Sequence, residues 1–96
     1  MYASSLSGIN AADTLLTARA DNIANADTPN FTSWVVQLTA QPLRGVSATV
    51  EKAAEPGVDL ADESVGLITG SLLYKANARA LETSAETDKS LLDVVA

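Results

Sequence analysis

The sequence of 96 residues contains no cysteine and no histidine. The absence of cysteine excludes disulfides and thiolate metal ligands. The absence of histidine removes the commonest metal ligand and the usual general base near neutral pH. The nearest approach to a catalytic pair, Glu82 and Glu86, has the helical spacing of a solvated stripe. We therefore expect no metal site, no bound cofactor and no enzymatic activity.

Aromatic and basic residues are also scarce. Only 4% of the residues are aromatic, although 47% are hydrophobic, which favours thin seams between helices over a thick core. Six basic residues against twelve acidic ones give a net charge of −6, which argues against nucleic acid or an anionic membrane as a partner. No apolar run approaches the roughly 20 residues of a membrane span. The first residues also lack the pattern of a cleavable signal peptide.

Apolar residues recur at spacings of three and four over residues 4–27, which predicts a helix with one apolar seam. The row comprises Tyr2, Leu6, Ile9, Leu16, Ala20 and Ile23, with Asp13 as a polar member. The pair Thr28-Pro29 should end this helix, because the residue before proline avoids helical dihedrals and proline donates no N–H group.

Residues 28–58 show the period of two that is typical of strands. Trp34, Val36 and Leu38 alternate with more polar positions, and Val46, Ala48 and Val50 do so later. The segment 41–45 has proline early and glycine late, as a turn requires. This predicts a β-hairpin, which is marginal alone and needs a helix to pack on. We expect Trp34 to cover it against the C-terminal helix.

A second and longer helix is predicted over residues 59–95, with Asp59 as its N-cap. Its seam follows a 4,3 alternation through Leu60, Ser64, Leu67, Ser71, Tyr74, Ala78, Leu81, Ala85, Asp88, Leu92 and Val95. A second apolar row, Ala61, Val65, Ile68 and Leu72, widens the stripe. The glycines of the segment 66–70 have the spacing that lets two helices approach closely, the alternative being glycines tolerated on an exposed face.

Together these patterns predict one mainly α domain over residues 1–96. Its two long helices would pack as an antiparallel coiled-coil hairpin with a small β-hairpin inserted between them. The longer helix would then overhang by roughly 18 Å and carry Leu91, Leu92, Val94 and Val95 beyond its partner. Such an apolar overhang indicates a partner surface. A frayed terminus or simple self-association is the alternative.

Two motifs at opposite ends of the chain point to a family. The segments LSGINAA, residues 6–12, and NIANADTP, residues 22–29, closely resemble the N-terminal signature of bacterial flagellar rod and hook proteins. The segment VDLADE, residues 58–63, with Leu67-Ile68 and YKAN, residues 74–77, resembles the C-terminal signature of the same family. Departures are Asp21 where the family has asparagine, Ser64 where it has an apolar residue, and Asn30 where it has glycine. Asparagine tolerates positive φ, so this turn is expected to survive.

The resemblance implies a structural subunit of the basal-body rod in the periplasm, which polymerises through its terminal helices and transmits torque. It also implies export without a leader, through the flagellar type III apparatus. Partners would be other rod and hook subunits, further copies of this chain and the export apparatus. The short segment between the two signatures is similar to that of the smaller, proximal-rod members of the family. The alternative is a small adaptor or regulatory paralogue that does not polymerise. The residues implied for subunit contacts are Asn22, Ile23, Asn25, Thr28, Pro29, Phe31, Leu67, Tyr74, Asn77, Leu81, Leu92 and Val95.

Overall fold

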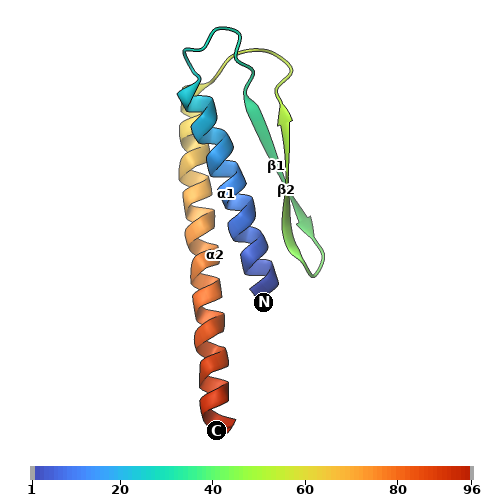
Figure 1. Cartoon of the computed structure of the whole chain (residues 1–96), viewed down its shortest axis with the longest axis vertical. Coiled ribbons are helices and arrows are strands. Elements are labelled where there is room, and N and C mark those ends of the chain that lie inside the picture. The colour runs from blue at the N-terminus through green and yellow to red at the C-terminus, as the bar shows by residue number, and fades with distance from the viewer. Residues whose placement is uncertain (1, 96) are drawn as a thin grey trace.

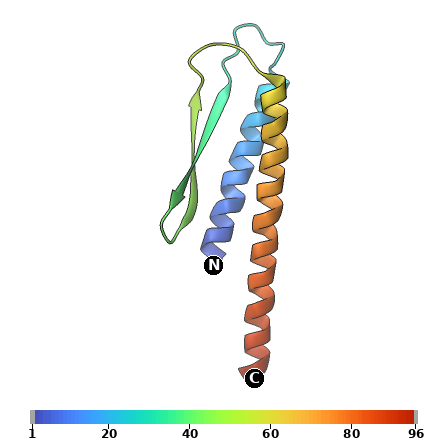
Figure 2. The same ribbon diagram turned by 180° about the vertical axis from the view of Figure 1, so that it is seen from behind.

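The computed structural model describes residues 2–95 and contains two helices and one β-hairpin. Helix α1 spans Tyr2–Ala24, strands β1 and β2 span Trp34–Gln41 and Gly45–Lys52, and helix α2 spans Leu60–Val95. The two helices lie side by side and run in opposite directions, with the hairpin beside α1 (Figure 1). The view from behind shows the same arrangement (Figure 2). The predicted mainly helical fold, with a small antiparallel sheet inserted between the two helices in the sequence, is confirmed.

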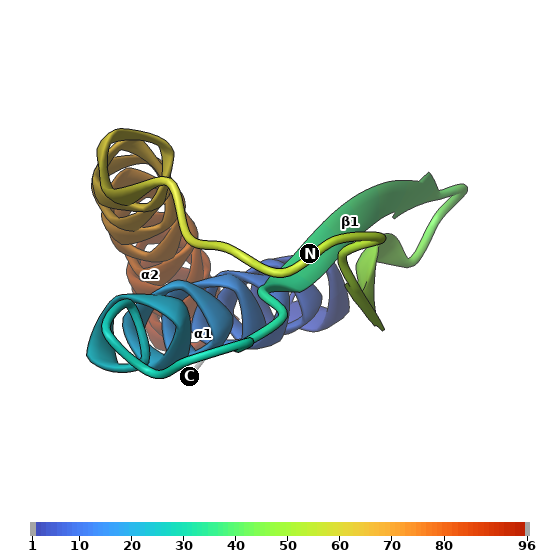
Figure 3. The ribbon, with the colours of Figure 1, turned by 90° about the horizontal axis from the view of Figure 1, so that it is seen from above.

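Helix α1 forms the middle layer of the molecule, between α2 and the hairpin (Figure 3). Helix α2 packs on α1 and on neither strand. The few buried apolar residues in the described part of the chain all belong to α1: Ala11, Ala12, Leu15 and Ala18. Such a thin core is what a sequence rich in alanine and poor in aromatic residues can build.

The hairpin therefore packs on α1, and the expectation that Trp34 covers it against the C-terminal helix is wrong. The indole Nε1 of Trp34 donates a hydrogen bond to the Asp21 carboxylate of α1 at 2.8 Å. The backbone N–H of Trp34 donates to Asn22 Oδ1 of the same helix at 2.8 Å. These polar contacts attach the first residue of β1 to α1. The hairpin therefore covers α1 and not α2.

The strands pair in register from Trp34 with Lys52 to Gln41 with Gly45. Their apolar alternate residues share one face of this two-stranded sheet, as expected from the period of two. The predicted turn at 41–45 is confirmed, since the backbone N–H of Arg44 donates to the Gln41 carbonyl at 3.0 Å. Pro42 and Leu43 occupy the central positions of this turn, and Leu43 has a φ of 66°.

The helix ends differ slightly from those expected. Helix α1 begins at Tyr2 and ends at Ala24, three residues before the expected end. The backbone N–H groups of Ala26 and Thr28 donate to carbonyls three residues earlier, so the chain leaves the α-helix through tight turns. At the start of α2, Asp59 Oδ1 accepts hydrogen bonds from the N–H groups of Ala61 and Asp62, which confirms the predicted N-cap.

The two helices meet through small and polar residues. Gly8 of α1 lies against Asn77 of α2, and Leu16 lies against Gly70. The contact on α2 therefore moves back toward its start as the contact on α1 moves forward, as in an antiparallel pair. The buried positions are Ser5, Gly8, Ala11, Ala12, Leu15, Ala18 and Asn22 on α1, and Glu63, Gly66, Gly70 and Ser84 on α2.

This buried seam lies one residue away from both predicted rows. On α1, Leu6 is 49% exposed and Asp13 is exposed, whereas Ser5 and Ala12 are buried. On α2, the predicted Tyr74 is 41% exposed. The physical reason is that small side chains let the helix backbones approach closely, so the larger residues are displaced to the flanks. The antiparallel pairing holds, but the buried row lies one residue before the predicted one, and of the predicted row Leu16 still lies against Gly70.

Gly66 and Gly70 are both buried in this seam. This confirms the predicted close contact between the helices and excludes the alternative that the two glycines lie on an exposed face. A Cβ atom on Gly66 would collide with the Arg19 side chain. A Cβ atom on Gly70 would lie 3.0 Å from Leu16 Cδ2 and 3.1 Å from its Cγ. The close approach of the helices therefore depends on these two residues.

Replacing Gly70 by leucine should lower the free energy of unfolding by about 1–3 kcal/mol, because the larger side chain forces the helices apart. The change is measured by urea denaturation followed by circular dichroism. Thr69→Leu is the matched control, since Thr69 is exposed and the same side chain there disturbs no seam. Equal losses of stability at the two positions would contradict the close packing at Gly70.

Ser84 is the last buried residue of α2, and residues 85–95 are exposed along their whole length. We call this segment the overhang; it extends about 16 Å beyond the helix pair. The predicted apolar overhang is thus confirmed, with Leu91 and Leu92 60% and 69% exposed and Val94 and Val95 both 84% exposed. No helix within residues 2–95 is both long and apolar enough to span a membrane.

Candidate functional site

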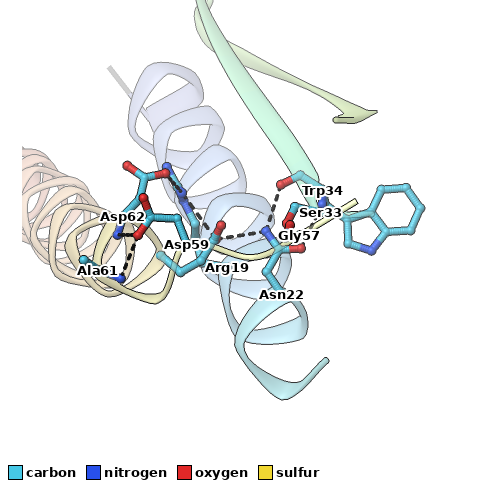
Figure 4. Close-up of polar contacts among 9 residues, drawn as sticks. Arg19, Asn22, Ser33, Trp34, Gly57, Asp59, Ala61 and Asp62 are labelled. Carbon is cyan, nitrogen blue, oxygen red and sulfur yellow. Dashed lines mark hydrogen bonds and ion pairs between the residues drawn. The ribbon is translucent and has the colours of Figure 1, made fainter. Parts of the chain in front are cut away.

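Asn22 joins α1, α2 and β1 at one point. Its side chain is fully buried, and its Nδ2 donates hydrogen bonds of 2.9 Å to Glu63 Oε1 and to the backbone carbonyl of Trp34 (Figure 4). Its Oδ1 accepts the backbone N–H of Trp34 at 2.8 Å. The amide thus pairs with the backbone of β1 as a neighbouring strand would, and its second amide hydrogen reaches α2. No other residue type of this size offers two donors and an acceptor in this geometry.

Glu63 and Arg19 complete this junction. Glu63 is only 4% exposed, and its Oε1 lies 3.3 Å from Arg19 Nη1. The same Arg19 nitrogen lies 3.0 Å from Asp62 Oδ2. Burial alone would lower the pKa of Arg19, but hydrogen bonds to Asp62 and Glu63 offset it, and the pKa is raised. Glu63 therefore has a permanent positive partner, which a carboxylate this deeply buried requires.

A second set of hydrogen bonds shapes the chain where it leaves α1. Asn25 Nδ2 donates to the Asp21 carbonyl at 2.9 Å, and Thr28 Oγ1 donates to Asn25 Oδ1 at 3.2 Å. Asn25 thus fixes the exit of the helix by bonding both to the last turn and to the departing chain. Asn30 has a φ of 61°, so asparagine does adopt the backbone conformation expected where the family has glycine.

The two linkers between helices and hairpin are also joined. The backbone N–H of Gly57 donates to the Phe31 carbonyl at 2.9 Å, and Ser33 Oγ donates to the Gly57 carbonyl at 2.6 Å. Gly57 has a φ of 129°, which a residue with a side chain rarely adopts. The linkers thereby hold the base of the hairpin beside the junction (Figure 4).

The two sequence motifs meet in two places. Asn22 of the N-terminal motif bonds to Glu63 of the C-terminal motif, as described above. Gly8 of the segment LSGINAA lies directly against Asn77 of the segment YKAN, since a Cβ atom on Gly8 would collide with the Asn77 amide. Residues far apart in the sequence thus form two contacts near opposite ends of one helix pair.

The residues implied for subunit contacts are spread over the whole molecule. Asn22 is buried, Thr28, Pro29, Tyr74, Leu92 and Val95 are exposed, and Ile23, Asn25, Phe31, Leu67, Asn77 and Leu81 are half-buried. The structure brings Asn22 and Asn25 together at the helix exit, whereas Leu92 and Val95 lie at the far end of α2. Arg19 was not singled out from the sequence, where nothing distinguishes it from a solvated arginine.

Large apolar residues also cover the side of α2 that faces away from α1. Val65, Ile68 and Leu72 are 60%, 64% and 62% exposed and form what we call the outer face of α2. The helical spacing of three and four aligns them in one row. A contiguous apolar row of this kind on a small protein indicates an interaction surface.

Within residues 2–95, no three carboxylates lie close enough together to hold a metal ion. No protein-family model and no curated protein matches the chain. The functional assignment therefore depends on the junction, the motif contacts and the exposed apolar surfaces.

Proposed function

We propose that the chain is a structural subunit of the bacterial flagellar basal-body rod, which polymerises through its terminal helices and transmits torque. The observation that carries this proposal is the pair of contacts between the two motifs, Asn22 with Glu63 and Gly8 with Asn77. Residues of both motifs are needed to close one helix pair. This gives a physical reason for the two signatures to occur together in one chain.

The exposed apolar surfaces support polymerisation. Covering a leucine or isoleucine side chain yields about 1.5–3 kcal/mol at full burial. The outer face of α2 and the overhang together leave several such residues in water. Neighbouring subunits that covered them would gain stability that the single chain lacks.

The overhang also continues the seam that α1 covers. The buried residues Glu63, Gly66 and Gly70 of α2 are spaced by three and four, and Ser84 lies two heptads further along the same row. The same spacing of three and four then runs from Ser84 through Thr87 to Leu91 and Val94. We infer that a helix of a neighbouring subunit takes the place of α1 along this segment. The pair would there form a coiled coil whose seam lies one residue before the predicted heptad row, at Leu91 and Val94 instead of Leu92 and Val95.

The proposed location is the rod in the periplasm, and the proposed route is the flagellar type III export apparatus. Quantifying the chain in isolated basal bodies tests this function. A fixed ratio to the other axial subunits is expected for a rod protein. A chain that copurifies with export components but is absent from the basal bodies would contradict the proposal and favour the adaptor.

A further inference from the structure

The tip of the β-hairpin carries a residue pair that the fold itself does not need. Leu43 is fully exposed, at 101% of its reference area, and its φ of 66° is strained for a residue with a side chain. A glycine there would remove the strain and the exposed apolar surface at once. The neighbouring Arg44 is exposed and forms no ion pair within residues 2–95. The tip thus presents one apolar and one cationic side chain to solvent.

A groove of complementary character lies between α1 and the base of the hairpin. Its volume is about 400 Å³, which falls within the range of roughly 300–1,000 Å³ for binding pockets. Its apolar lining is Ala18, Trp34 and Val50, and its carboxylates are Asp13 and Asp21. Asp13 is exposed and forms no ion pair within residues 2–95, so its charge is available.

The tip and the groove of one chain lie at opposite ends of the hairpin. The groove residue Trp34 pairs with Lys52 at the open end of the strands, whereas the turn at 41–45 closes the other end (Figure 1). A tip therefore cannot reach its own groove. The same two features on separate copies can meet without any change of fold.

We propose that the hairpin tip of one copy docks into this groove of the next, with Leu43 on the apolar lining and Arg44 beside Asp13 and Asp21. The occupant is a second copy of the chain, because an apolar and cationic tip matches an apolar and acidic groove. Since the two surfaces differ, the contact is heterologous and repeats from copy to copy. This inference rests on the proposed function, for which it names one of the contacts between subunits.

Trp34 is the only tryptophan and lines the groove, so its fluorescence reports whether the groove is occupied. We expect the emission maximum of the full chain to shift to the blue as the protein concentration rises. Arg44→Glu and Asp13→Arg should each raise the midpoint of this shift at least tenfold, because like charges then meet. The chain that carries both substitutions should regain a midpoint near that of the wild type. Gln37→Glu, on the exposed outer side of β1, is the charge control and should leave the midpoint unchanged.

Wild-type midpoints in both single variants, or no recovery in the double variant, would overturn the tip contact. Circular dichroism of each variant establishes that its fold is intact. If these variants assemble as the wild type does while Leu91→Asp prevents assembly, the tip contact is wrong and the proposed function stands. If the wild type remains monomeric at every concentration, both are wrong.

Discussion

Replacing Asn22 by alanine should lower the free energy of unfolding by about 3–5 kcal/mol. The substitution leaves the buried carboxylate of Glu63 and the partly buried backbone N–H and carbonyl of Trp34 short of a partner. Each buried group left unsatisfied costs about 1–3 kcal/mol. Domains of this size have only about 5–15 kcal/mol in total, so the variant should lose a large part of its stability.

Chemical denaturation followed by circular dichroism measures this loss. Asn22→Asp is the isosteric companion, since it keeps the volume but places a second carboxylate beside Glu63, and it should be at least as destabilising. Asn25→Ala is the control, because the hydrogen bonds of Asn25 are exposed and their loss should cost about 1 kcal/mol or less. Similar losses for Asn22→Ala and Asn25→Ala would show that Asn22 does not hold the three elements together.

Replacing Leu91 by aspartate should prevent assembly and leave the stability of the single chain unchanged. Leu91 is 60% exposed and lies in the overhang, where α1 gives it no cover. In an assembled coiled coil the same position would be buried, and an unpaired carboxylate there costs several kcal/mol. The affinity between subunits should fall at least a hundredfold, which corresponds to about 2.7 kcal/mol.

Sedimentation velocity measures the assembly and urea denaturation measures the stability. Ser90→Asp is the matched control, since it places the same charge on the adjacent residue, on another side of the overhang. It should assemble as the wild type does. Assembly by Leu91→Asp at wild-type concentrations would exclude the overhang as a subunit contact.

The sequence predicted the elements well because each has its own local signal. The period of two located both strands, and Pro42 with Gly45 located the turn. Asp59 marked the start of α2, and Thr28-Pro29 marked the end of α1 to within a few residues. These signals act over a few residues, so no knowledge of the tertiary structure is needed to recognise them.

The seam was wrong by one residue because hydrophobic periodicity follows the largest apolar residues. In this chain Gly8, Ala12 and Gly70 bring the helices together, and small residues contribute little to such a pattern. The larger Val65, Ile68 and Leu72 point away from α1. The periodicity therefore identified surfaces of the helices that the single chain leaves open.

The position of Trp34 was wrong for a related reason. The alternation of residues shows that one face of the hairpin is covered, but it does not show which helix covers it. The choice of helix depends on the Asn22 amide, which bonds to the backbone N–H and carbonyl of Trp34. These bonds would form with any residue at position 34 that has a free backbone N–H. Backbone partners of this kind leave no pattern in the sequence.

The overhang connects assembly with folding. A helical segment of this length is marginal in water without tertiary contacts, because isolated helices shorter than about 12–15 residues are barely stable. Residues 85–95 have no such contacts in the single chain. A neighbouring subunit that covered Leu91 and Val94 would therefore stabilise the helix as well as bury its apolar side chains.

Sedimentation velocity of the full-length wild-type chain from micromolar to millimolar concentration, with circular dichroism on the same samples, tests this coupling most directly. If copies assemble through the overhang, the sedimenting species should grow without a fixed upper size, and the helical signal per residue should rise with it. A monomer of constant size and constant helicity over the whole range would contradict assembly through the terminal helices.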